Sequence, residues 1–203
     1  AFDGLNDYVF GMGAGVVPTG TVPYTVSVWF KRSVFSGARE MLSQWTTGGN
    51  SFFLGFSDNN ARFSDSWPTV GIGLLPDSDW HQLVAVSTTN NAFLFLDGEL
   101  RAAKGSPLTY TAAADLYFGR QGTYGGGAEW FGGVLDEIRV EGTSRSAAWI
   151  RAAYENQRAP RDFFAFGEAA DLTVPLAQPL PPSPLSPTNA FLRGEVLSEG
   201  QAD

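Results

Sequence analysis

The sequence contains no cysteine. That absence excludes disulfide bonds, zinc–thiolate sites and thiol nucleophiles. It also contains no apolar run of about 18 residues, so no segment is expected to insert into a membrane. Basic residues are few, with 13 Lys and Arg against 21 Asp and Glu, which gives a net charge of −8. A chain this acidic is not expected to bind nucleic acid or anionic membrane surfaces.

Helical periodicity is scarce too, whereas the chain has 24 glycines and 14% aromatic residues. This composition indicates an all-β protein. Alternation predicts clear strands over 24–31, 79–87 and 92–96, and Asp97-Gly98 is a hairpin turn signal. Further strands are predicted at 41–45, 51–56, 115–119 and 130–140, and weaker strand patterns fall at 62–67 and 70–74. The one predicted helix covers 147–156, with Ser144 or Ser146 as its N-cap.

The composition changes after residue 167. We therefore expect a β domain at 1–167, a Pro-rich linker at 168–187 and a strand-like tail at 188–203. The tail is too short to fold alone, so it either begins a further domain or pairs with a sheet edge, in the same molecule or in another copy. The chain opens at Ala1 already inside a strand pattern, so we expect it to be a piece of a longer protein.

Asp136 is the residue whose environment most needs an explanation. On a regular strand it shares a face with Val134, Ile138 and Val140, and an unpaired carboxylate on an apolar face is costly. Its partner could be a metal ion, an arginine or a set of backbone N–H groups. A bulge near the Gly132-Gly133 pair would shift the register by one residue.

Several motifs occur together in one order along the chain. They are Phe2-Asp3-Gly4, Thr25-Val26-Ser27-Val28-Trp29-Phe30, Trp80-His81-Gln82-Leu83-Val84-Ala85-Val86, Phe95-Leu96-Asp97-Gly98, the strand at 131–140 and the start of the helix at 145–150. This set resembles the laminin G-like, concanavalin A-like jelly-roll domain of bacterial extracellular proteins, over about residues 1–160. The resemblance implies a two-sheet β-sandwich jelly roll with one short C-terminal helix and an extended tail. The tail is similar to the opening of a fibronectin type III-like repeat.

The resemblance also implies a structural Ca²⁺ site that joins the first strand to the last. Asp136 and Asp3 match the positions that such a site uses, and backbone carbonyls near Gly4 could complete its shell of hard oxygen ligands. The alternative is that Asp136 accepts backbone N–H groups or pairs with an arginine.

Pentraxin-like relatives of this fold place ligands on loops that correspond to the regions around Asn50 and Gln121. The acidic pairs expected there are replaced by Gly49-Asn50 and Gln121-Gly122, so two divalent ions are not expected. What is left is a set of aromatic and polar loop residues that suits a sugar, because rings stack on its C–H faces and polar groups reach its hydroxyls. The predicted ligand-binding residues are Trp45, Asn50, Trp67, Gln121, Tyr124, Glu129 and Trp130. The alternative is that these rings anchor the loops.

Catalysis is not expected. Retaining glycosidases need two carboxyl groups about 5 Å apart, and the spacing typical of this fold, such as Glu-x-Asp-x-x-Glu, does not occur. Adjacent Asp136 and Glu137 face opposite ways on a regular strand, and Glu137 and Glu141 lie about 13 Å apart along one. The single His81 has no nucleophile near it in sequence and is expected to make a structural hydrogen bond.

The fold hosts lectins, adhesion modules, spacers and glycosidases, so it does not decide the function. We expect a non-catalytic, extracellular or cell-surface module that binds carbohydrate or a cell-surface glycan. The alternative is a structural or adhesion module that self-associates through the tail, and a third candidate is a glycoside hydrolase or lyase domain.

Overall fold

A computed structural model describes residues 1–9, 13–44, 51–64, 70–73, 77–109, 114–121, 129–163, 177–179 and 194–196. The chain divides into two compact units, Ala1–Pro160 and Arg161–Asp203. None of the helices in these described ranges is long and apolar enough to cross a membrane.

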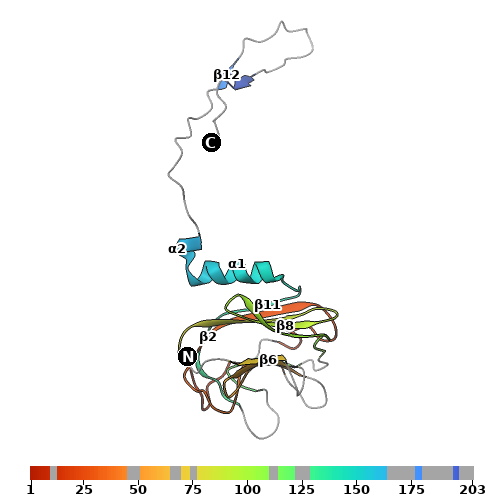
Figure 1. Cartoon of the computed structure of the whole chain (residues 1–203), viewed down its shortest axis with the longest axis vertical. Helices are drawn as coiled ribbons and strands as arrows, with labels where there is room; N and C mark the ends of the chain where they lie inside the picture. The colour runs from red at the N-terminus through yellow and green to blue at the C-terminus, as the bar shows by residue number, and fades with distance from the viewer. Residues whose placement is uncertain are drawn as a thin grey trace. The chain divides into compact units, whose positions relative to one another are not determined.

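The first unit is a sandwich of two antiparallel sheets (Figure 1). The six-stranded sheet has the order β1 (Phe2–Asp3), β11 (Gly132–Glu141), β2 (Tyr24–Arg32), β7 (His81–Ser87), β8 (Ala92–Leu96) and β9 (Glu99–Lys104). The five-stranded sheet has the order β10 (Leu116–Phe118), β3 (Ala38–Gln44), β4 (Phe52–Ser57), β5 (Asn60–Ser64) and β6 (Val70–Gly73). The predicted all-β, two-sheet fold is confirmed.

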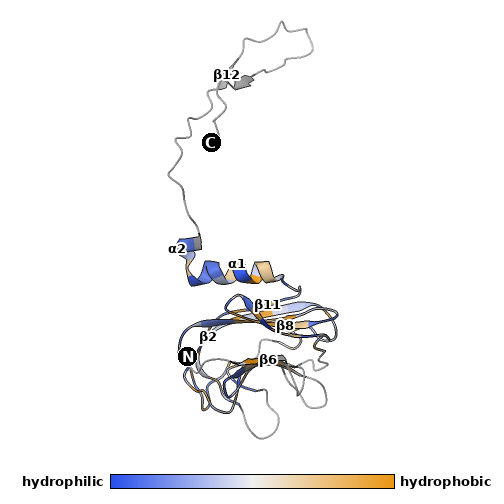
Figure 2. Ribbon diagram, viewed as in Figure 1, coloured by the Kyte–Doolittle hydropathy of each residue, from blue (hydrophilic) through white to orange (hydrophobic). Residues whose placement is uncertain are grey.

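The core lies between the two sheets, where Figure 2 shows the apolar stretches of the strands. Val28 and Phe30 of β2 and Leu83 of β7 are fully or almost fully buried, as are Leu54 and Phe56 across from them. The Phe30 and Phe56 ring centroids are 5.2 Å apart. Burying one such side chain stabilises the fold by roughly 1.5–3 kcal/mol. The predicted strands at 24–31, 79–87 and 92–96 are found because one face of each alternates into this core.

A β-bulge interrupts β11 and changes the face on which Asp136 lies. The register against β2 shifts between Asp136 and Arg139, and Glu137 adopts a left-handed φ of 48°. Leu135, Ile138 and Val140 consequently pack against the core, while Asp136 is exposed. The prediction that Asp136 lies on the apolar face is therefore wrong: the bulge lies at Asp136-Glu137 rather than at the glycine pair.

The predicted helix is α1 (Ala147–Arg158), which packs on the outer face of the six-stranded sheet (Figure 1). Ser146 is its N-cap and accepts a hydrogen bond from the Trp149 backbone N–H at 3.2 Å. Ile150 is buried against Val84, Val86 and Phe95 of the sheet. The helix is apolar toward its N-terminal end and hydrophilic toward its C-terminal end (Figure 2). Tight apolar packing therefore belongs to the first half of α1.

α2 (Pro160–Phe163) follows α1. In the second unit, β12 (Ala177–Pro179) pairs antiparallel with β13 (Gly194–Val196). β12 lies within the segment expected to be a linker, and β13 lies within the tail expected to be strand-like. In the described part of the second unit, β13 thus finds its partner inside the same unit. Pairing of this segment with a sheet edge stays a prediction.

Candidate binding sites

The predicted ligand-binding loops lie only partly within the described residues. Trp45, Asn50, Trp67 and Tyr124 fall outside them, whereas Gln121, Glu129 and Trp130 fall inside. Trp130 contacts Tyr8, with 5.7 Å between ring centroids. The Arg120 guanidinium carbon lies 4.6 Å from the Trp130 centroid and 4.8 Å from the Tyr8 centroid. The two ring faces that Arg120 covers are therefore occupied by the protein itself.

Glu129 takes part in a buried charge network with Arg62 and Glu40 on the five-stranded sheet. Arg62 Nη2 donates to Glu129 Oε2 at 3.0 Å and also pairs with Glu40 Oε1. Glu40 is fully buried, and this burial, opposed by Arg62 and reinforced by Glu129, raises the pKa of Glu40 to about 8. This network could not be predicted from the sequence, because Glu40 and Glu129 are 22 and 67 residues from Arg62. Its burial indicates a structural role, in which Arg62 ties Glu129 and β3 together.

The two acidic residues predicted to bind calcium both accept backbone N–H groups. Asp3 Oδ1 accepts from Leu5 N at 2.8 Å and from Asn6 N at 3.1 Å, and these hydrogen bonds lower the pKa of Asp3. Asp136 Oδ1 accepts from Glu137 N at 2.8 Å. Among the described residues, no three His, Cys, Asp or Glu side chains lie together in a way that could hold a metal ion. This geometry matches the alternative of a backbone donor at Asp136, and Ca²⁺ at Asp3 and Asp136 stays a prediction.

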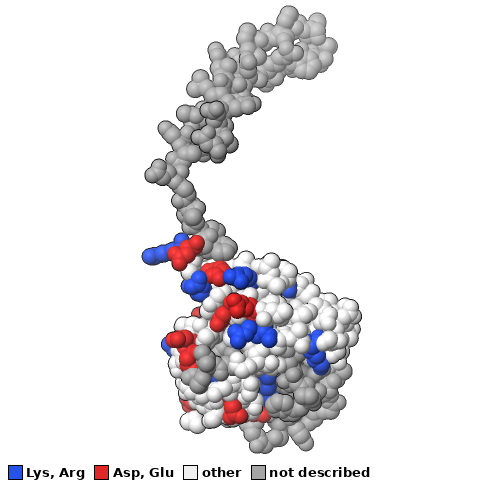
Figure 3. Space-filling model, viewed as in Figure 1, with Lys and Arg blue, Asp and Glu red and all other residues white. Residues whose placement is uncertain are grey.

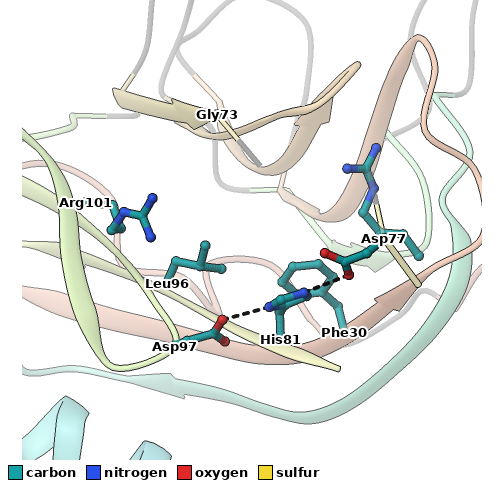
Figure 4. Close-up of a pocket in the computed structure, with 8 residues that line it drawn as sticks. Phe30, Gly73, Asp77, His81, Leu96, Asp97 and Arg101 are labelled. Atoms are coloured by element: carbon teal, nitrogen blue, oxygen red, sulfur yellow. Dashed lines mark hydrogen bonds and ion pairs between the residues drawn. The ribbon is translucent and has the colours of Figure 1, made fainter. Parts of the chain in front are cut away.

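A cavity of about 380 Å³ lies between the two sheets and is here named the inter-sheet cavity (Figure 4). Its lining residues are Phe30, Arg32, Gly73, Asp77, His81, Leu96, Asp97 and Arg101. Figure 4 shows the His81 ring pointing between two carboxylates. Its Nδ1 lies 2.7 Å from Asp97 Oδ2 and its Nε2 lies 2.9 Å from Asp77 Oδ1. His81 therefore makes structural hydrogen bonds, as expected, and clamps the turn after β8 to the segment before β7.

The two carboxylates set the ionisation of His81. Hydrogen bonds to Asp97 and then Asp77 raise the pKa of His81 to about 9, against the opposing effect of burial. The pKa of Asp77 is lowered, mainly by the hydrogen bond from His81. Since the raised pKa belongs to the folded state, protonated His81 stabilises the fold fully below its unfolded value of 6.5, and this contribution is lost as the pH rises through about 9.

We therefore expect the free energy of unfolding to fall between pH 6.5 and pH 9. The loss should be on the order of 2 kcal/mol, since each pKa unit corresponds to about 1.4 kcal/mol and His81 is partly exposed. His81→Gln keeps a polar group but cannot titrate, so it should make this pH dependence shallower and leave the contribution of Glu40. Urea unfolding of the wild-type protein and of His81→Gln between pH 6.5 and pH 9 measures the free energy of unfolding. An equal pH dependence in the two proteins would contradict the contribution of His81.

A second hollow lies on the outer face of the six-stranded sheet, beside the C-terminal half of α1, and is here named the helix–sheet groove. It is open to solvent and has a volume of about 380 Å³. Its lining residues are Trp29, Trp80, Asp136, Glu137, Tyr154, Gln157 and Arg158. The bulge in β11 brings both adjacent carboxylates to this groove, so the expectation that Asp136 and Glu137 face opposite ways is wrong.

Aromatic rings and a fixed amide build the wall of the helix–sheet groove. The Trp29 ring stacks on Tyr154, with 5.5 Å between centroids and 12° between planes. Gln157 Oε1 accepts from Trp29 Nε1 at 2.5 Å and from Gln82 Nε2 at 2.9 Å. These two bonds hold α1 against the sheet and fix the ring wall. Trp80 also lines the groove and is 43% exposed. The groove therefore combines a preformed aromatic surface with carboxylate, amide and guanidinium groups.

The fold defines the class of protein: a two-sheet antiparallel jelly roll with one helix on its outer face. The chain belongs to the concanavalin A-like lectin/glucanases superfamily, whose family model matches residues 3–151. The family resemblance expected from the sequence is thereby confirmed. No curated protein sequence matches the chain significantly.

Solved structures with the same fold include carbohydrate-active and toxin proteins. Domain 4 of AbnA, an extracellular GH43 arabinanase from Geobacillus stearothermophilus solved with arabinotriose, is 15% identical with a TM-score of 0.55, over 72% of this chain and 80% of that one. The botulinum neurotoxin serotype G binding domain is 9% identical with a TM-score of 0.61, over 78% and 42%. A Trypanosoma rangeli sialidase is 14% identical with a TM-score of 0.53, over 68% and 23%. The chain thus spans less than half of the last two, and these likenesses show the fold alone.

Proposed function

We propose that this chain is a non-catalytic carbohydrate-binding module that works outside the cell, and that its glycan lies in the helix–sheet groove. The observation that carries the proposal is half-exposed Trp80, which lines the groove beside the stacked Trp29 and Tyr154 rings. Aromatic faces of this kind pack on the apolar faces of sugar rings, while neighbouring carboxylate and amide groups accept or donate hydrogen bonds to hydroxyls. The complex of AbnA domain 4 with arabinotriose supports the proposal, because it shows a sugar held by a domain of this fold.

The helix–sheet groove suits a glycan better than the surface formed by Tyr8, Arg120 and Trp130, which is here named the loop face. On the loop face, the Trp130 and Tyr8 rings already hold the Arg120 guanidinium between them. In the groove, Trp80 is open and Gln157 fixes Trp29. A site that is already rigid loses less conformational entropy when it binds. The non-catalytic part of the proposal rests on the sequence, in which the Glu-x-Asp-x-x-Glu spacing of glycosidases with this fold does not occur.

Trp80→Ala is expected to weaken glycan binding by about tenfold, equivalent to about 1–2 kcal/mol for a lost aromatic contact. Tyr8→Ala is the matched control, because Tyr8 on the loop face is 42% exposed and Trp80 is 43% exposed. Both variants should fold, since neither ring is buried. A glycan array identifies a ligand, and calorimetry with that ligand compares the variants.

Three other results would redirect the proposal. Loss of binding in Tyr8→Ala but not in Trp80→Ala would place the site on the loop face. Absence of binding across the array would favour the second candidate, a structural or adhesion module. Release of reducing sugar from a bound glycan would show that the module is catalytic, and so would contradict the proposal.

A further inference from the structure

The helix–sheet groove carries charges that bear on which glycans it accepts. Its lining residues include two carboxylates, Asp136 and Glu137, and one guanidinium, that of Arg158. Figure 3 shows charged side chains gathered around the C-terminal end of α1 and the neighbouring part of the six-stranded sheet, while much of the rest of this face is uncharged. The balance between acidic and basic groups in the groove therefore depends on which of them already have partners.

Asp136 is the groove carboxylate that is placed to pair with a cationic ligand. Its Oδ1 accepts only the N–H of Glu137, and it makes no ion pair within the described residues. Glu137 pairs with Arg139, but the two side chains are 50% and 45% exposed. An ion pair this exposed contributes little and exchanges readily with another cation. Both carboxylates are thus open to a positively charged ligand.

Arg158, the cation of the groove, is already engaged. Its Nη2 and Nε donate to Glu155 Oε2 at 2.8 Å and 3.1 Å. Its guanidinium carbon also lies 5.9 Å from the Tyr154 ring centroid. An anionic ligand would have to compete with Glu155 for Arg158 while facing Asp136 and Glu137. The chain as a whole, with a net charge of −8, adds to the repulsion of anions.

The aromatic wall attracts the same kind of ligand as the carboxylates do. The faces of Trp and Tyr rings carry negative electrostatic potential and attract ammonium groups placed within about 6 Å. Trp29, Tyr154 and half-exposed Trp80 line the groove together with Asp136 and Glu137. A sugar that carries an ammonium group can stack its ring on the aromatic wall and place its charge beside a carboxylate.

We propose that the helix–sheet groove selects cationic glycans, namely oligosaccharides of amino sugars with free ammonium groups, over neutral and acidic ones. This selectivity rests on the proposed carbohydrate-binding function of the same groove. Asp136 supplies the discriminating charge, and half-exposed Trp80, beside the stacked Trp29 and Tyr154 rings, supplies a surface on which the sugar lies.

The test compares two tetrasaccharides, of glucosamine and of N-acetylglucosamine, which share one backbone and differ in charge. Calorimetry at pH 6 and low salt should show the glucosamine tetramer binding about tenfold more tightly, as for a cation–π contact and one exposed ion pair. Asp136→Asn should remove most of this difference, because asparagine keeps the acceptor for Glu137 N but loses the charge. Asp115→Asn, beside β10 of the other sheet, makes the same change in net charge and should leave the difference intact.

Each other outcome is decisive. Equal binding of the two tetramers, with no effect of Asp136→Asn, would overturn the charge selectivity and leave carbohydrate binding standing. If Asp136→Asn and Asp115→Asn reduce the preference for the glucosamine tetramer equally, net charge alone attracts the ligand, and the role of Asp136 is overturned. Binding of neither tetramer, nor of any glycan on the array, would overturn the proposed function itself.

Discussion

Gly133→Ala is expected to lower the free energy of unfolding by about 3 kcal/mol or more, through backbone strain and overpacking together. Gly133 has a φ of 146°, which side chains with a Cβ rarely adopt, and a Cβ there would lie 2.0 Å from the Lys31 carbonyl oxygen. That oxygen belongs to β2, at the centre of the six-stranded sheet, so it cannot move without disturbing the register of β2. Urea unfolding measures the effect.

Gly142→Ala is the matched control. Gly142 directly follows β11, and a Cβ at this position meets no atom within 4 Å. The same change of residue should therefore alter the stability there by no more than about 0.5 kcal/mol. Equal effects of the two substitutions would contradict the close approach of β11 to β2 at Gly133.

Arg62→Leu is expected to destabilise the fold by about 3–5 kcal/mol at pH 9, because at this pH it leaves a buried, ionised carboxylate without its cation. Glu40 is fully buried, and Arg62 is the cation that it shares with Glu129. A carboxyl group whose folded pKa is raised stabilises most below its unfolded value, near 4.5, and this contribution is lost as the pH rises toward about 8. At pH 5 Glu40 is neutral, so the cost of Arg62→Leu should be smaller there than at pH 9.

The double variant Glu40→Gln/Arg62→Leu separates the orphaned charge from the lost packing. With glutamine in place of Glu40, the penalty at pH 9 should fall to about the smaller value found at pH 5, and its pH dependence should be lost. Unfolding of the single and double variants at both pH values gives the comparison. If Arg62→Leu costs as much at pH 9 in the Glu40→Gln background as in the wild-type background, Arg62 acts through packing and not through charge.

Strand alternation was enough to predict β2, β7 and β8, because one face of each strand packs into the core. It failed at β11, since the bulge places Glu137 at positive φ, a conformation for which glutamate carries no sequence signal. That single irregularity exposes Asp136 and puts Asp136 and Glu137 in one groove. An argument from regular strand geometry could not have found either result.

The helix–sheet groove was not predictable for a different reason. On a regular strand Trp29 lies opposite Val28 and Phe30, and on a regular helix Tyr154 lies one turn after Ile150; both positions agree with the observed stacking. The sequence could not show that the two rings meet, because docking a helix on a sheet depends on contacts such as Trp29 to Gln157, which are 128 residues apart. The predicted ligand-binding residues lie on loops instead, because aromatic residues in a loop can be recognised from the local sequence. The docking of a helix on a sheet cannot be recognised in this way.

The most direct test of the groove as a glycan site is the NMR signal of each tryptophan indole N–H during titration with a bound oligosaccharide. Single Trp→Phe variants assign the signals. The groove predicts that the Trp29 and Trp80 signals shift, whereas the Trp149 signal, with its ring covered by Arg145 at 4.4 Å, stays in place. A shift of Trp130, with Trp29 and Trp80 unchanged, would contradict it.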